Sequence, residues 1–164
     1  MTAAAWSAGF HLHVRVSALA QTVFVPKESD SSETRVAASP DSVKKMVGLG
    51  LTVVIEKGAG HSSRITDDAF AAAGAKMGSA ADAKSADVIL KVRRPNASEI
   101  KGYKKGAAVI AAMDPYGQND AVKAMADAGL SAFAMEFMPR ITRAQVMDIL
   151  SSQANLAGYQ AVID

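Results

Sequence analysis

Short apolar runs alternate with segments of helical periodicity along most of the chain. The continuous apolar run at Thr52–Ile55 predicts a strand that is buried on both faces, and Asp87–Val92 predicts another clear strand. Similar runs predict further strands at Thr22–Val25, Ala107–Ala112 and Ser131–Met135, with a weaker one near Ala75–Met77. Strands that alternate with short helices are typical of βαβ units. The pattern therefore predicts a doubly wound, mostly parallel α/β sheet with helices on both faces, Rossmann-like in architecture.

Capping residues mark the predicted helices between these strands. Ser39-Pro40 predicts an N-cap followed by a first-turn proline, and Gly50 lies where that helix should end in a left-handed residue. Thr66 predicts the N-cap of a second helix that Gly74 closes. The remaining predicted helices lie near Ala80–Ser85, at Asn119–Ala128, and from Thr142 towards Asp164.

The length of 164 residues corresponds to about one domain, which we assign to residues 22–164. Residues 1–21 lack the regular pattern and are expected to be a disordered or foreign N-terminal extension. A signal peptide is disfavoured because no basic region opens the segment, and His11, His13 and Arg15 interrupt its apolar stretch. The helical pattern reaches Asp164 without a C-cap, so we expect a fragment of a longer chain.

The composition excludes several classes of function. The chain has no cysteine, which excludes disulfides, thiolate metal sites and a cysteine nucleophile. A net charge of +2 without long basic runs does not support nucleic-acid binding. His11 and His13 could chelate a metal, but no acidic residue lies near them in the sequence, so a metal site is disfavoured. No apolar run reaches the ~18 residues that a membrane-spanning helix needs.

Charged residues follow four of the predicted strands. Because ligands of an open parallel sheet bind outside the carboxyl ends of its strands, these residues should meet at one edge and favour an anionic ligand. The candidate cleft residues at that edge are Arg35, Lys91, Arg93, Met113 and Asp114. A purely structural alternative stays open, in which Arg93 and Arg94 belong to a solvated loop and Arg35 bonds loop carbonyls.

Two further segments resemble functional motifs. Gly58-Ala59-Gly60 resembles the start of a dinucleotide fingerprint, but Ser63 stands where the fingerprint needs its third Gly or Ala. A plain turn is therefore favoured over a phosphate cradle. Thr142 and Gln145 have the spacing of a capping box, with Asp148 and Ser151 on the helix that follows. Spacing alone favours a structural role for these four residues.

A family resemblance favours a functional role for this segment instead. The chain contains Pro26-Lys27-Glu28, Glu33-Thr34-Arg35-Val36-Ala37, Glu56-Lys57-Gly58-Ala59-Gly60 and Leu90-Lys91-Val92-Arg93-Arg94-Pro95 in that order. These motifs resemble the N-terminal domain family that alanine dehydrogenases share with nicotinamide nucleotide transhydrogenases. The long segment Met138–Tyr159 is similar to the transhydrogenase alpha subunit in particular. The resemblance covers residues 22–164.

The resemblance implies both a cofactor and its binding residues. In that family the domain faces a C-terminal Rossmann domain of the same subunit that holds NAD(H), and this chain ends before such a domain. A loop leans over the nicotinamide, and its arginine, glutamine and aspartate fall on Arg140, Gln145 and Asp148. A serine near the carboxamide falls on Ser151, and Tyr159 matches a family tyrosine.

The resemblance also implies partners and a location. Hydride would pass between NAD(H) and an NADP(H) held on a partner subunit, coupled to proton translocation through membrane subunits. The subunit would be a homodimer, peripheral to the cytoplasmic side of the bacterial inner membrane.

Two alternative functions stay open from the sequence. An alanine dehydrogenase would need a substrate-binding lysine and a catalytic histidine in this domain. The lysine position carries Arg93, the histidine position falls in Met113-Asp114-Pro115, and no histidine follows Ser62. The second alternative is a non-catalytic fragment that folds without binding nucleotide.

Overall fold

The computed structural model describes residues 21–163, which form one six-stranded, entirely parallel sheet. The strand order is β3-β2-β1-β4-β5-β6, the arrangement of two βαβαβ halves joined in the middle. The strands are β1 (Thr22–Val25), β2 (Thr52–Glu56), β3 (Lys76–Gly78), β4 (Val88–Arg93), β5 (Ala108–Ala112) and β6 (Ser131–Ala134). The order reverses between β1 and β4, which is where this fold class binds its ligands.

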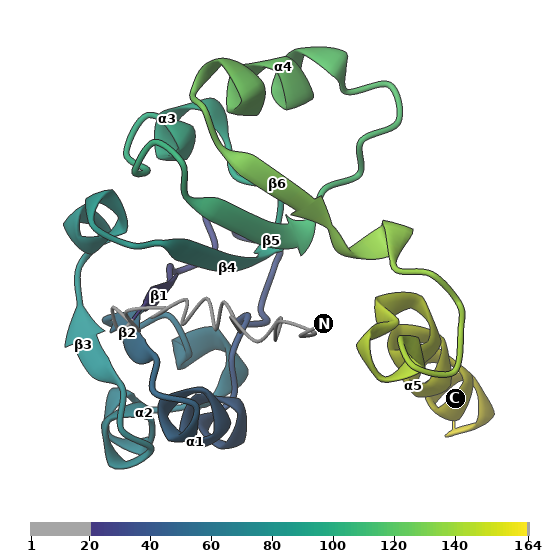
Figure 1. Ribbon diagram of the computed structural model, residues 1–164. Coiled ribbons are helices and arrows are strands. Elements are labelled where there is room, and N and C mark those ends of the chain that lie inside the picture. The colour runs from purple at the N-terminus through teal and green to yellow at the C-terminus, as the bar shows by residue number, and fades with distance from the viewer. Residues whose placement is uncertain (1–20, 164) are drawn as a thin grey trace, which may run out of the picture.

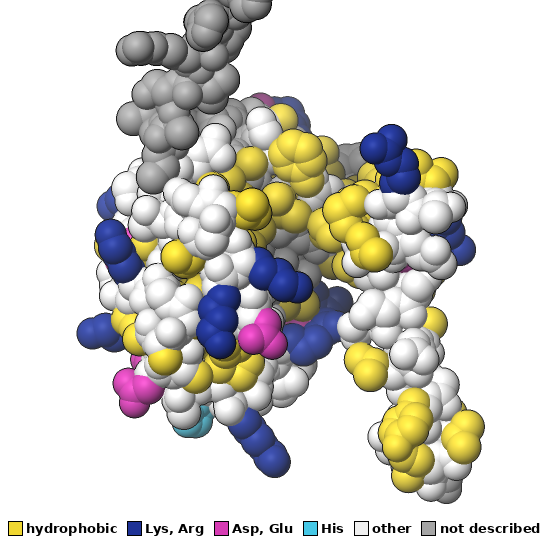
Figure 2. Space-filling view, turned by 60° about the horizontal axis from the view of Figure 1, so that its bottom comes forward, with side chains coloured by type: hydrophobic (Ala, Val, Ile, Leu, Met, Phe, Trp, Pro, Cys, Tyr) yellow, Lys and Arg dark blue, Asp and Glu magenta, His cyan; other side chains and the backbone are white. Residues whose placement is uncertain are grey.

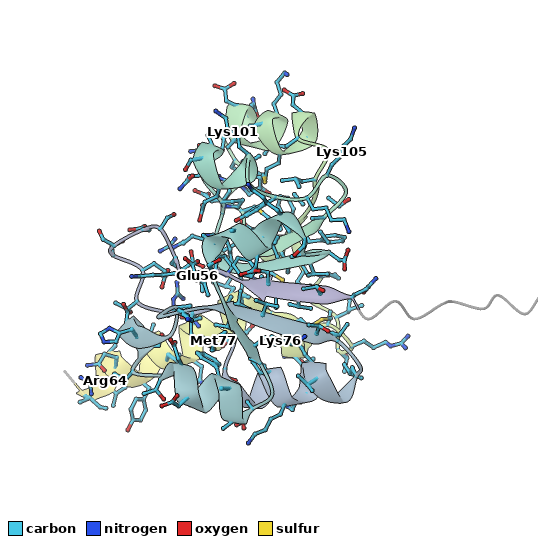
Figure 3. All side chains as sticks on the ribbon, turned by 90° about the vertical axis from the view of Figure 1, so that its left-hand side faces the viewer. Glu56, Arg64, Lys76, Met77, Lys101 and Lys105 are labelled. Atoms are coloured by element: carbon cyan, nitrogen blue, oxygen red, sulfur yellow. The ribbon has the colours of Figure 1, made fainter. Side chains whose placement is uncertain are left out.

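Helices cover both faces of the sheet, each over a different half (Figure 1). On one face, α1 (Pro40–Gly48) and α2 (Asp67–Ala72) bury a core around Val43, Ile55 and Phe70. On the other face, α3 (Ala97–Ile100) and α4 (Asn119–Asp127) lie with the 3-10 helix η2 (Ala80–Lys84) over a second core that contains Phe24, Ile89 and Met125. Figure 3 looks onto the β3 edge, where Lys76 and Met77 lie, and shows the sheet between the two helical layers.

The predicted doubly wound parallel fold is confirmed, together with most of the predicted caps. Ser39 caps α1 and Thr66 caps α2, in both cases through side-chain oxygens that accept backbone N–H bonds. Gly50 and Gly74 have positive φ directly after a helix, as predicted, and Gly129 does so after α4. The predicted helix near Ala80–Ser85 is instead the 3-10 helix η2. Its larger rise of about 2.0 Å per residue lets a short segment link β3 to β4.

The C-terminal helix begins later than predicted. Helix α5 spans Ile149–Ile163, and Thr142 does not cap it. Two short 3-10 helices lie between β6 and α5: η3 (Met135–Phe137) directly after the strand and η4 (Gln145–Met147) just before the helix. Asp148 begins α5 because its carboxylate accepts hydrogen bonds from the backbone N–H groups of Leu150 and Ser151, and Asp is a stronger N-cap than Thr. The predicted extension at residues 1–21 lies outside the described residues apart from Gln21.

Candidate functional site

A buried ion cluster lies where the strand order reverses. Lys91 is on the inward face of β4, because Ile89 two residues earlier points into the same core. Its Nζ lies 2.7 Å from Glu99 Oε1 and 3.4 Å from Glu28 Oε2. The Lys91 side chain is fully buried and that of Glu28 is 3% exposed. Glu28 also accepts a 2.7 Å hydrogen bond from the Val92 N–H, so it ties the loop after β1 to β4.

These contacts hold the end of β1 in place, and they leave the Lys91 ammonium group unavailable to a ligand. A buried charge is tolerated only when it is paired and hydrogen-bonded, and Lys91 meets both conditions within the protein. Glu99 serves a second purpose, since its other oxygen accepts the Asn96 N–H at 2.7 Å and completes a capping box that begins α3. Lys91, a candidate cleft residue, therefore has its ammonium group enclosed beneath the edge of the sheet.

Glu33 binds two of the predicted basic residues. Arg35 donates to it from Nε at 2.7 Å and from Nη2 at 2.6 Å, and Arg93 donates from Nε at 2.9 Å. The Glu33 side chain is buried, while both arginines are about half exposed. The Arg35 hydrogen bonds hold the pKa of the Glu33 carboxyl far below its usual range, at about 2. Arg35 and Arg93 thus lie together at the predicted edge, joined by one carboxylate.

Glu33→Gln should cost stability in a pH-dependent manner. The folded-state pKa of Glu33 lies below the unfolded value, so its contribution is full above about pH 4.5 and is lost as the pH falls towards 2. Because both arginines are partly screened by solvent, we expect a loss of about 1–2 kcal/mol at pH 7. Urea denaturation at pH 7 and pH 3 measures it. The gap between variant and wild type should shrink at pH 3, and a gap that does not change with pH would contradict the assignment.

Arg94 and Glu136 hold the turn that follows β5. Arg94 Nη1 donates to the carbonyl oxygens of Met113 at 2.5 Å and Asp114 at 2.8 Å. The carboxylate of Glu136 accepts the N–H groups of the same two residues. Asp114 has a left-handed backbone with φ of 42°, a conformation that Asp tolerates better than most residues. Arg94 is therefore not part of a solvated loop, and Met113 contributes to the core while Asp114 lies at the exposed edge.

A groove separates the carboxyl edge of the sheet from α5. Its volume is about 480 Å³, and its apolar floor includes Leu90 and Ile110 from β4 and β5. Ile149 and Gln153 line it from α5, and Gln153 Oε1 accepts a 3.1 Å hydrogen bond from Arg35 Nη1. Arg35 thus connects Glu33, beside the end of β4, to the helix on the other side of the groove.

The residues that the resemblance assigns to nicotinamide lie on the exposed segment beyond this groove. Arg140 and Gln145 are exposed in the segment between η3 and α5, in which Ala144 is buried. Ser151 Oγ donates a 2.6 Å hydrogen bond to Asp148 Oδ2, and this bond is the largest of the causes that lower the Asp148 pKa. Tyr159 is 70% exposed, two turns further along α5.

Helical geometry separates the two groups of residues on α5. Successive residues turn by about 100°, so Ser151 lies on the side of the helix opposite Ile149 and Gln153. Ser151 therefore faces away from the groove and from the body of the domain. The structure brings together Arg35 with Arg93 at the sheet edge and, separately, Asp148 with Ser151 at the start of α5.

Four further residues build this edge: Glu28 and Glu136, which are among the charged residues expected after the strands, and Glu99 and Gln153, which sequence reasoning missed. Only Glu99 left a local signal, the capping-box spacing from Asn96, because the other three contact residues distant in sequence. Gly58 belongs to a turn, and its N–H donates to the Asp67 carboxylate. Within residues 21–163, no group of three or more metal-binding side chains meets, and no helix is long and apolar enough to span a membrane. His11 and His13 lie outside the described residues.

Comparisons with known proteins place the chain in a family and support its fold. Residues 24–157 match the family model described as "Alanine dehydrogenase/PNT, N-terminal domain". The chain is 50% identical over 149 residues to an NAD(P) transhydrogenase alpha-subunit protein of Rhodospirillum rubrum, and the match spans 87% of this chain and 39% of that protein. The solved transhydrogenase structure from Sinorhizobium meliloti superposes with a TM-score of 0.86 at 67% identity, over 88% of this chain and 43% of that one.

Similarity to alanine dehydrogenases is weaker. Alanine dehydrogenase 1 of Staphylococcus aureus is 30% identical over 141 residues, 86% of this chain and 37% of that protein. A solved L-alanine dehydrogenase superposes with a TM-score of 0.71 at 30% identity, over 76% of this chain and 34% of that one. The chain spans about two fifths of the length of these two transhydrogenase relatives.

Proposed function

Because the chain belongs to the alanine dehydrogenase/transhydrogenase N-terminal domain family, on its transhydrogenase alpha-subunit branch, we propose that it forms one side of a transhydrogenase NAD(H) cleft. The parent enzyme transfers hydride between NAD(H) and NADP(H). The observation that carries this proposal is the group Arg140, Gln145, Asp148 and Ser151, in which Asp148 is half-buried and the other three side chains are exposed. A nucleotide held by a facing domain can reach these side chains.

The role of the group is positioning rather than acid–base chemistry. Hydride transfer between two nicotinamides needs no protein proton donor, only rings held at short range and in register. Gln145 offers an amide that can both donate to and accept from a carboxamide, and Ser151 offers a hydroxyl already oriented by Asp148. Arg140 supplies a positive charge for an anionic nucleotide.

The partner that faces this domain is, in our proposal, a C-terminal Rossmann domain of the same subunit. Helix α5 contains no charged residue along Ile149–Ile163, yet Leu156 and Val162 are exposed. On the sheet face that α1 and α2 leave open, Phe133 is 55% exposed. Figure 2 shows hydrophobic side chains on the arm that α5 forms at the right of the view. Apolar helices and sheet faces are normally covered, and the relatives extend well beyond the matched region.

The wider assembly is part of the same proposal. NADP(H) binds to a partner subunit, and separate membrane subunits couple hydride transfer to proton translocation. The full-length subunit is a homodimer, peripheral to the cytoplasmic side of the bacterial inner membrane. The membership of the transhydrogenase branch supports each of these assignments.

A substrate comparison tests the proposed function. The full-length subunit, assembled with its partners, should reduce an NADP analogue with NADH and should not oxidise L-alanine. Arg93 occupies the lysine position that an alanine dehydrogenase needs, and the residues after Ser62 offer no histidine to act as acid or base. Spectrophotometric assays of both reactions on one preparation decide between them. Alanine oxidation without transfer to the NADP analogue would overturn the proposal.

A further inference from the structure

Two oppositely charged side chains hold the turn after β5 from its two sides. The turn residues Met113 and Asp114 direct both N–H groups to the Glu136 carboxylate and both carbonyl oxygens to Arg94 Nη1. A carboxylate accepts two N–H bonds, and a guanidinium donates to two carbonyls. The charges of the two side chains therefore match the backbone groups that they bind. Bonds to ionised partners are about twice as strong as neutral ones.

This arrangement connects three neighbouring strand ends. Arg94 follows β4, the turn follows β5, and Glu136 lies in η3 directly after β6. The carboxyl edge of this half of the sheet is thus fixed by contacts that no strand pairing supplies. Glu136 is also only four residues before Arg140, and η3 leads straight into the loop that ends at Asp148.

We propose that Glu136, held through the Met113–Asp114 turn by Arg94, is a positioning residue that sets where the Arg140–Asp148 loop begins. This inference rests on the proposed function, since it gives the loop's placement a catalytic consequence. The loop is otherwise largely exposed, and Ala144 is its one buried residue. Loss of the Glu136 contacts frees the start of the loop while the sheet below remains paired.

Glu136→Gln is the sharpest change, because it keeps the size of the side chain. The glutamine amide has one accepting oxygen, and its NH₂ group cannot accept the second N–H. In the 164-residue chain, hydrogen exchange of the Met113 and Asp114 amides should become about tenfold faster, as expected when a net hydrogen bond is lost. Unchanged exchange would overturn the anchoring role, whatever the activity of the enzyme.

The catalytic consequence is measured in the full-length subunit with its partners. A displacement of about 1 Å costs about 100-fold in rate, so kcat should fall at least tenfold in Glu136→Gln while the dissociation constant for NADH changes little. Arg94→Met should act alike, and the double variant should be no slower than either single one. Asp127→Asn removes a charge from the exposed pair with Lys123 and serves as the matched control.

The two failures can be told apart. A lowered thermal midpoint with normal kcat in Glu136→Gln would make the residue merely structural and overturn the inference alone. A wild-type subunit that transfers no hydride would overturn the proposed function, and this inference with it.

Discussion

Gln145→Ala in the full-length subunit is expected to lower the rate of hydride transfer by about 100-fold while the thermal midpoint barely moves. Gln145 is exposed, and the structure gives it no capping role, because Thr142 does not begin a helix. If its amide orients the nicotinamide, a misplacement of about 1 Å is enough for that loss. The assay follows NADH-driven reduction of an NADP analogue, beside a thermal melt of each variant.

Other residues of the loop separate catalysis from stability. Arg140→Ala should also lower the rate, whereas Arg143→Ala, an equally exposed arginine of the same loop, should not. Asp148→Ala removes the N-cap of α5, so it should lower the thermal midpoint as well as the activity. Normal turnover in Gln145→Ala and Arg140→Ala would leave the loop a purely structural connection.

Lys91→Met should destabilise the chain by about 3–5 kcal/mol. The substitution leaves the Glu28 carboxylate buried without its cation, beneath the ends of β1 and β4. That loss is a large fraction of the roughly 5–15 kcal/mol typical of a domain. Urea denaturation at pH 7 measures the change.

A matched variant isolates the effect of burial. Lys104→Met also removes one lysine from an ion pair, but its pair with Asp87 is partly exposed and should be worth no more than about 1 kcal/mol. Adding Glu28→Gln to Lys91→Met should recover some of the loss, since the uncompensated charge disappears. Equal effects of Lys91→Met and Lys104→Met would contradict the importance of the buried cluster.

The fold could be predicted from the sequence because its determinants are local. The apolar run at Thr52–Ile55 and the caps at Ser39 and Thr66 act within a few residues of themselves. The start of α5 was predicted wrongly because Thr142 with Gln145 and Asp148 with Ser151 both have cap spacing, and in the structure it is Asp148 that accepts the N–H bonds at the start of the helix. Spacing along the sequence cannot decide which of two candidate caps begins the helix.

The edge of the sheet could be predicted only in outline. The strand-end rule located Arg35 and Arg93 correctly, but it treated them as free cations for an anionic ligand. Glu33 forms an ion pair with each of them, and Glu136 binds a turn more than twenty residues earlier in the chain. Such pairings depend on which strands are neighbours, so they can be predicted only when the strand order is known.

The central claim is that the Arg140–Ser151 segment contacts the nicotinamide of NAD(H). Met138 and Met147 lie just before this segment and within it, and their methyl groups can be observed by NMR in a subunit labelled at methionine. NADH should shift both methyl signals in the full-length subunit, whereas ADP-ribose, which lacks the nicotinamide, should bind without shifting them. Saturating NADH that leaves both signals in place, or shifts them no more than ADP-ribose does, would contradict the account.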